Sequence, residues 1–326
     1  MVSSSLVNSV LFNPSNEAWE SILSELLRVF SVPFDESPTQ EILKREKFVS
    51  ELETLISGSC WDIWNDFDKA VPKTSSLLKK FWASHQNGKA IFIIDGLSLR
   101  ELPILLHEAK KRGYTIQHSR VSGSELPSET TTFARSIGFS QRSSLQNNIT
   151  GPDHVLDNAT TQCVDLPWND CVGFINSEPN WILWHVYFDD LIHSYSDPGK
   201  GLRDLISKSQ QHFTSNDFWN LINKLAYGRR LIITSDHGYA ATSEYMNVNE
   251  VQTEYLRSIY KSQRFAKSDD LSNHWMPPID IHLNSTHGSY RYVLGKRKWK
   301  SSGGYPTLAH GGLSLMETLV PFIELS

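Results

Sequence analysis

Four short, strongly apolar runs constrain the fold of this chain more than any other feature of its sequence. They are residues 90–94, 181–188, 231–234 and 319–323. Apolar runs of this length, rich in β-branched side chains, are typical of strands buried on both faces, as in parallel sheets. Stretches with helical patterns, 97–112 and 201–227, lie between them. This alternation predicts an α/β fold, a mostly parallel sheet sandwiched by helices.

The first 88 residues are predicted to form a helical N-terminal region. Apolar side chains recur at the helical period over residues 19–30, and a second helix is predicted to begin at Ser37 and to end at Gly58. We interpret this region as a helical layer packed on the α/β core. The alternative interpretation is a module that docks a partner protein.

Residues 89–326 are predicted to form the second domain, which carries the chemistry. Two polar segments interrupt its alternating pattern, at about 138–180 and 240–288. Each is too long to be a plain loop in a compact domain. We therefore interpret both as insertions that cap the site and set substrate choice.

Composition limits the partners that the chain can have. Its 31 Lys and Arg residues and 36 Asp and Glu residues give a net charge of −5, which argues against a broad basic face for duplex nucleic acid. No stretch approaches the roughly 20 apolar residues of a membrane span, and the first residues do not resemble a signal peptide. The three cysteines are odd in number and lack the spacing of a zinc knuckle. We therefore expect a reduced, cytoplasmic protein.

Three of the apolar runs are followed within two residues by an aspartate. These aspartates are Asp95, Asp189 and Asp236. In an open α/β sheet the ligand lies beyond the carboxyl ends of the strands, so three strands would deliver carboxylates to one edge. A single aspartate in such a place is most often a helix N-cap. Three of them predict a shared site.

Histidines accompany these aspartates. Asp189 and His193 are four residues apart, so a helix after the strand would place both on one side. His237 adjoins Asp236, and His310 stands before two glycines, where the backbone can approach a site closely. We therefore expect the three histidines to join the three carboxylates.

The clustered carboxylates require cations. Two carboxylates about 4 Å apart repel by roughly 4 kcal/mol at an effective dielectric constant near 20. Oxygen and imidazole ligands together suit zinc or manganese. A pair of such ions about 3.5–4 Å apart can stabilise both the attacking and the leaving oxygen of a phosphoryl transfer.

Hydroxyl groups that could act as a nucleophile stand in the segment 126–132. Ser128, Thr130 and Thr131 are all candidates, because a hydroxyl at the start of a helix lies in a positive field. The alternative for each is an ordinary helix N-cap. The residues alone leave this choice open.

Together these motifs resemble the alkaline phosphatase superfamily and, within it, the PglZ domain. The resemblance covers about residues 90–326. Its motifs are Ile94-Asp95-Gly96-Leu97, Leu126-Pro127-Ser128-Glu129-Thr130, Asp189-x-x-x-His193, Thr234-Ser235-Asp236-His237-Gly238, and residues 310–322, which begin His310-Gly-Gly-Leu-Ser. The resemblance implies the alkaline-phosphatase-like version of the predicted fold. The helices before residue 90 also resemble those that often precede a PglZ domain.

The resemblance implies a role for each matching residue. One zinc ion would be held by Asp95, Thr130, Asp236 and His237, and the other by Asp189, His193 and His310. Thr130 matches the family nucleophile, with Ser128 and Thr131 as competitors. Asp190 is the alternative to Asp189, and the spacing to His193 favours Asp189.

The resemblance implies hydrolysis of phosphodiesters or related phosphoesters, including nucleotides and nucleic acid, and a role in bacterial phage defence. Residues 290–300 interleave basic and aromatic side chains, which indicates either a patch for single-stranded nucleic acid or a solvated hairpin. A different hypothesis is a non-catalytic, metal-stabilised module that docks to defence or signalling proteins through residues 1–88. Elemental analysis of the purified protein separates the two hypotheses.

Overall fold

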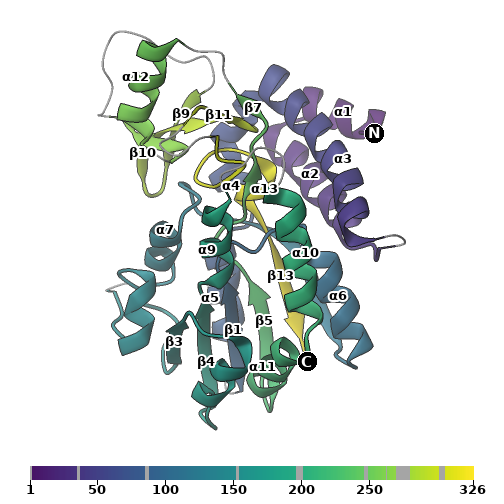
Figure 1. The fold of residues 1–326 in the computed structure, drawn as a ribbon, viewed down its shortest axis with the longest axis vertical. Coiled ribbons are helices and arrows are strands. Elements are labelled where there is room, and N and C mark those ends of the chain that lie inside the picture. The colour runs from purple at the N-terminus through teal and green to yellow at the C-terminus, as the bar shows by residue number, and fades with distance from the viewer. Residues whose placement is uncertain are drawn as a thin grey trace.

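The computed structural model describes residues 2–34, 37–84, 88–151, 154–195, 201–245, 249–261, 263–268, 280–300 and 305–326. A six-stranded sheet forms the centre of the fold, in the order β2-β13-β5-β1-β4-β3 (Figure 1). These strands are β1 (Lys89–Ile94), β2 (Ile116–Gly123), β3 (Thr160–Val164), β4 (Asn180–His185), β5 (Arg230–Thr234) and β13 (Leu319–Leu325). Strands β3, β4, β1 and β5 pair in parallel, whereas β13 pairs antiparallel with β5 and β2.

Helices cover both faces of this sheet, which confirms the predicted fold class. Successive residues of β1 enter two different apolar cores: Phe92 packs with one and Ile93 with the other. The first core includes side chains of α1 (Ser4–Phe12), α2 (Ser15–Phe30), α3 (Pro38–Ser59), α6 (Leu102–Lys111), α10 (Gly201–Thr214) and α11 (Asn216–Ala226). The second core includes α5 (Thr74–Ser84) and α7 (Thr130–Ser136). This two-sided burial explains why the strands are uniformly apolar.

The N-terminal helices are a layer of this core. Trp19, Ile22 and Phe30 of α2 are buried in the same cluster as Phe92 of the central strand. Helix α3 begins where the sequence predicts, because the Ser37 hydroxyl accepts a hydrogen bond from the Gln40 N–H. The boundary between residues 88 and 89 remains a prediction, as does a protein partner for this region.

Two elements differ from the sequence-based expectation. The run 181–188 is not one strand: β4 ends at His185, Val186 adopts helical angles, and α9 (Tyr187–Ser194) begins at once. The stretch 201–227 forms two helices rather than one, because Ser215 has extended angles and caps α11 through the Phe218 N–H. Apolar periodicity alone does not reveal such short interruptions.

The two polar segments are more than insertions. Residues 138–180 contribute β3, which pairs with β4 at the edge of the central sheet, so the interpretation of this whole segment as a cap is wrong. Residues 240–288 contribute α12 (Glu250–Tyr260), β8 (Phe265–Lys267) and β9 (Asp280–Ser285), which join β10 (Gly288–Val293) in a small region above the central sheet in Figure 1. Part of this second segment lies outside the described residues.

The cysteines and the search for membrane-spanning helices bear on two further expectations from the sequence. The three cysteines, Cys60, Cys163 and Cys171, are buried free thiols. Among the helices that the structure describes, none is long and apolar enough to cross a membrane.

A buried ion pair joins the N-terminal layer to the core and gives a stability prediction. The fully buried Arg100 donates from Nε to Glu46 Oε1 at 2.7 Å, and its Nη1 donates to the Tyr239 carbonyl at 2.6 Å. We expect Glu46→Ala to lower the free energy of unfolding by about 3–5 kcal/mol, because the guanidinium stays buried without its partner. Urea denaturation measures this loss. The control is Glu25→Ala, which removes an exposed pair with Arg28 and should cost at most about 1 kcal/mol.

Candidate metal centre

The site lies at the carboxyl ends of the two central strands. Asp95 directly follows β1, and Asp236 and His237 follow its neighbour β5 after one intervening residue, Ser235. The Gly96 N–H donates to Asp236 Oδ1 at 3.2 Å, which fixes the two strand ends to each other. The edge predicted from the apolar runs is therefore where these side chains gather.

Asp189 reaches the site by a different route. It was expected at the end of a strand, but it lies in the first turn of α9, four residues after β4 ends. The i, i+4 relation to His193 is nevertheless kept, because both residues belong to this helix. His193 Nε2 lies 3.5 Å from Asp189 Oδ1. The adjacent Asp190 is exposed, whereas Asp189 is buried.

Thr130 is the centre of one group of side chains. It is the first residue of α7, and its hydroxyl donates to Asp236 Oδ2 at 2.9 Å. The same oxygen lies 3.4 Å from Asp95 Oδ1 and 3.4 Å from His237 Nε2. Asp95, Asp236 and His237 are fully buried. Two carboxylates and an imidazole thus lie within hydrogen-bonding distance of the Thr130 hydroxyl.

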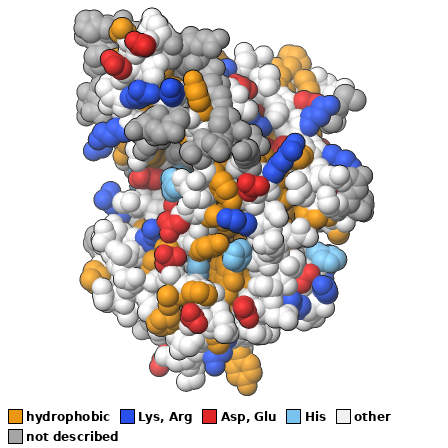
Figure 2. Space-filling model, in the orientation of Figure 1, with side chains coloured by type: hydrophobic (Ala, Val, Ile, Leu, Met, Phe, Trp, Pro, Cys, Tyr) orange, Lys and Arg blue, Asp and Glu red, His pale blue; other side chains and the backbone are white. Residues whose placement is uncertain are grey.

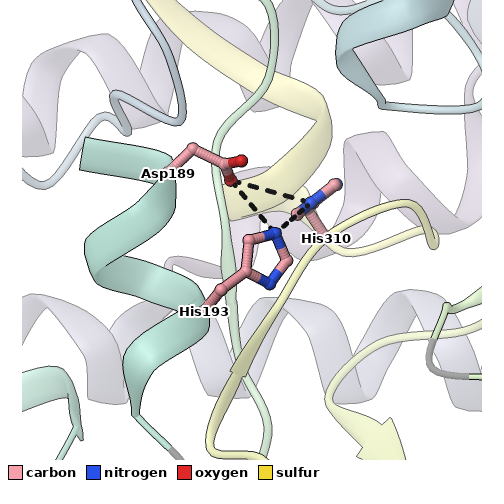
Figure 3. Close-up of side chains that lie close together, drawn as sticks. All are labelled: Asp189, His193 and His310. Atoms are coloured by element: carbon pink, nitrogen blue, oxygen red, sulfur yellow. Dashed lines mark hydrogen bonds and ion pairs between the residues drawn. The ribbon is translucent and has the colours of Figure 1, made fainter. Parts of the chain in front are cut away.

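The second group consists of Asp189, His193 and His310 (Figure 3). His310 follows β12 (Leu308–Ala309), and its Nε2 lies 3.2 Å from His193 Nε2 and 3.7 Å from Asp189 Oδ1. The His310 Nδ1 lies 3.2 Å from the Ser128 carbonyl, which orients the ring. One potential ligand atom from each residue lies within 4.8 Å of the others.

The two groups adjoin and form one site. The rings of His237 and His310 stack with centroids 4.0 Å apart. Ligand atoms of Asp95, Asp189 and His237 also lie within 4.8 Å of one another. The structure therefore brings together all seven residues singled out from the sequence. Their side chains come from five separate stretches of the chain, the last of which is the loop that carries His310.

Burial and closely spaced carboxylates shift the pKa values of several side chains in the site. Burial, together with the charges of Asp236 and Asp189, raises the pKa of Asp95 well above its usual value. Burial alone would lower the pKa of His237, but the carboxylates of Asp236, Asp189 and Asp95 raise it to about 9. Burial and the neighbouring His237 lower the pKa of His310 to about 3. A neutral His310 is the form that can bind a metal ion.

Of the three candidate hydroxyls, Thr130 is the one that contacts the site carboxylates. Ser128 is fully buried, and its Oγ donates instead to the Gly312 carbonyl at 3.4 Å. The Thr131 hydroxyl makes no hydrogen bond with any part of the chain that the structure describes. The geometry therefore separates candidates that the sequence left equivalent.

Two residues at the site were missed by sequence reasoning. Arg142 pairs through Nη1 with Asp95 Oδ2, and Trp184 Nε1 donates to the same oxygen at 3.0 Å. Trp184 immediately precedes the last residue of β4, a position that could have signalled proximity to the site. Arg142 begins a 3-10 turn within a polar segment, and no local pattern points to its contact with a residue 47 positions away.

The basic stretch 290–300 does not form an exposed patch. Lys296 and Lys298 are buried, and the buried Arg291 pairs with Asp280 at 2.7 Å. Lys296 Nζ donates to Ser50 Oγ of α3 at 2.5 Å and to Glu46 at 3.5 Å. The interpretation of this stretch as a platform for single-stranded nucleic acid is therefore wrong for these side chains. The other expectation, a solvated hairpin around Gly295, is also wrong, because β10 ends at Val293 and pairs with β9, whereas β11 (Arg297–Lys298) pairs with β7 (Glu244–Tyr245).

The site is open to solvent on one side. The His193 side chain is 57% exposed, whereas Asp95 and His237 are fully buried. Figure 2 shows acidic and histidine side chains reaching the surface on this face of the molecule. A substrate can thus approach from the His193 side while the carboxylates remain shielded.

Comparisons with known proteins give fold similarities only. No protein-family model matches the chain, and no curated protein matches its sequence. Among solved structures, phosphonoacetate hydrolase from Sinorhizobium meliloti in complex with phosphonoformate is 13% identical, with 72% of this chain and 89% of that chain covered and a TM-score of 0.44. Murine ectonucleotide pyrophosphatase/phosphodiesterase 5 is 13% identical, with 74% and 88% covered and a TM-score of 0.41. At this level the likeness is one of general architecture, so the chemistry has to follow from the side chains of this chain.

Proposed function

We propose that this chain is a metal-dependent phosphoester hydrolase of the alkaline phosphatase superfamily. One observation carries the proposal: a threonine hydroxyl, three carboxylates and three imidazoles converge near the strand ends, with the closest pairs of ligand atoms 2.9–3.7 Å apart. Oxygen and imidazole donors in this mixture suit zinc or manganese. The finer assignment to the PglZ domain is supported by the motif at residues 310–322 and by the motif that ends at Thr130.

The side chains fit two divalent cations. One would be held by Asp95, Thr130, Asp236 and His237, and the other by Asp189, His193 and His310. The fit is supported by Asp189 Oδ1, a buried oxygen without a hydrogen-bond donor among the described residues, although two imidazole nitrogens lie within 3.7 Å of it. Such cations would supply Lewis-acid stabilisation of the phosphoryl oxygens.

In this proposal Thr130 is the nucleophile. Its hydroxyl hydrogen points at Asp236 Oδ2, so an oxygen lone pair is free for a substrate phosphorus. A bond forms between Thr130 Oγ1 and phosphorus as the hydroxyl proton passes to Asp236 Oδ2, and the bond to the leaving oxygen breaks, which gives a threonine phosphoester while the leaving oxygen takes a proton from solvent. Water then attacks phosphorus and loses a proton to solvent, Thr130 Oγ1 leaves and takes back its proton from Asp236, and the phosphate product departs.

Small phosphodiesters or phosphomonoesters, such as nucleotides, fit the site better than long nucleic acid. The buried positions of Lys296 and Lys298 remove the basic surface that a long chain would need, and the net charge is −5. Arg142 provides a cation at the site, with its side chain 29% exposed. The proposal includes a role in bacterial phage defence, which is supported by the resemblance to PglZ domains.

Hydrolysis of bis(4-nitrophenyl) phosphate and 4-nitrophenyl phosphate tests the proposal. We expect the purified protein to release nitrophenol with added zinc or manganese and to stop when EDTA is present, because the carboxylates cannot act without their cations. Restoring the metal should restore the rate. Binding of metal without turnover of any phosphoester would favour the non-catalytic module instead.

A further inference from the structure

The short helix α13 (Leu315–Thr318) lies where three loops of the site meet. Its residues Met316, Glu317 and Thr318 are buried, and no step of the proposed reaction uses them. The Glu317 carbonyl accepts a hydrogen bond from the Gly238 N–H at 2.9 Å, next to His237. The Thr318 carbonyl accepts one from the Ser124 N–H at 2.8 Å, in the loop that leads to Thr130. The backbone of α13 thus supports two of the three loops.

The Glu317 side chain supports the third loop, which carries His310. Its Oε2 accepts the Gly312 N–H at 3.1 Å, and its Oε1 accepts the Ser314 N–H at 2.7 Å. Oε1 also forms an ion pair with Arg264, and all these groups are buried. A carboxylate can accept all three donors, whereas an amide of the same shape has only one accepting oxygen.

The segment that links His310 to the residues bound by Glu317 is tightly packed. A Cβ on Gly312 would lie 2.7 Å from the Val293 carbonyl and 3.0 Å from Arg264 Cζ, so glycine is needed at this point. Gly311 has a φ of +97°, which a residue with a side chain rarely adopts. Only Gly311 separates His310 from Gly312, the first residue that Glu317 binds.

We propose that Glu317 is a positioning residue that holds His310 against Asp189 and His193. The proposal rests on the proposed function only through the cation site to which His310 belongs. Residues that orient metal ligands from behind typically change metal affinity by about 10- to 100-fold when they are replaced. Apart from its ion pair with Arg264, the Glu317 side chain bonds only the His310 loop among the described residues, so its replacement should weaken one of the two cation sites selectively.

Calorimetric titration of metal-free protein with zinc tests this inference. We expect two binding steps in the parent protein, and at least a tenfold loss in one step for Glu317→Gln, with the other step changed less than about threefold. The affected step should be the one that His310→Ala removes. A variant that only loosened the fold would weaken both steps.

Glu324→Gln is the matched control. Glu324 is also a buried carboxylate in an ion pair, with Arg230, but it lies near the far end of β13, opposite Ile232 in the middle of β5. This variant should keep both affinities. If Glu317→Gln does not fold, as judged by circular dichroism, Glu317→Asp takes its place, because it keeps a charge for Arg264 but shortens the reach to Gly312.

The outcomes separate this inference from the proposed function. Equal zinc affinities in the parent and in both Glu317 variants, or equal losses in both steps, would overturn the role of Glu317 while leaving hydrolysis untouched. A parent protein that binds two ions and hydrolyses no phosphoester would overturn the proposed function, yet the selective loss in Glu317→Gln would still support the positioning role.

Discussion

Thr130→Ala is expected to reduce phosphoester hydrolysis by roughly 10⁴- to 10⁶-fold, the scale of the loss when an enzyme loses its nucleophile. The hydroxyl that contacts Asp95, Asp236 and His237 is then absent, and no other hydroxyl takes its place. Steady-state release of nitrophenol with saturating zinc measures the loss. Thr130→Ser should retain much more of the rate, because it keeps the hydroxyl on the same backbone.

Two neighbouring hydroxyls provide the controls for this prediction. Thr131→Ala should stay within about tenfold of the parent rate, since its hydroxyl does not contact the site carboxylates. Ser128→Ala should have an intermediate effect at most, because within the described part of the chain its Oγ hydrogen-bonds only to the Gly312 carbonyl. Loss of activity in Thr131→Ala with retention in Thr130→Ala would move the nucleophile to the competing residue.

Asp189→Ala is expected to have the second largest effect. We expect it to lose one bound ion and to lower kcat by at least about 10²- to 10³-fold, the scale of removing one group that stabilises the transition state. Asp189 is the carboxylate that both His193 and His310 approach, at 3.5 and 3.7 Å. Elemental analysis of the purified variant, together with its kcat, measures both effects.

The neighbouring Asp190 is the natural control for that variant. It has the same charge and lies on the same helix, but it is exposed. Asp190→Ala should keep the metal content and lose less than about threefold in kcat. The reverse outcome, with loss in Asp190→Ala alone, would assign the ligand to the other aspartate.

Much of the site could be predicted because the positions of its residues depend on short sequence spacings or on the arrangement of the parallel strands. Asp95 comes directly after β1 and Asp236 two residues after the end of β5, and parallel strands bring their carboxyl ends to one edge. The prediction for Asp189 was right about its spacing from His193 but wrong about its element. The chain turns into a helix at Val186, and the apolar sequence there is equally compatible with strand and helix.

The remaining contacts could not be predicted because they join distant segments. Arg142 reaches Asp95 from a polar segment, and Arg264 reaches Glu317 from 53 residues away. The basic stretch 290–300 shows the opposite error. Its composition indicated an exposed surface, but Lys296 is buried beside Glu46 of an N-terminal helix, and nothing within the stretch itself reveals that partner.

The most direct test of this account is anomalous diffraction at the zinc absorption edge from crystals of the zinc-loaded protein. The account predicts two peaks about 3.5–4 Å apart at the ends of β1 and β5. One peak should lie among Asp95, Thr130, Asp236 and His237, and the other among Asp189, His193 and His310. Zinc bound only elsewhere on the protein, with these seven side chains free of any ion, would contradict it.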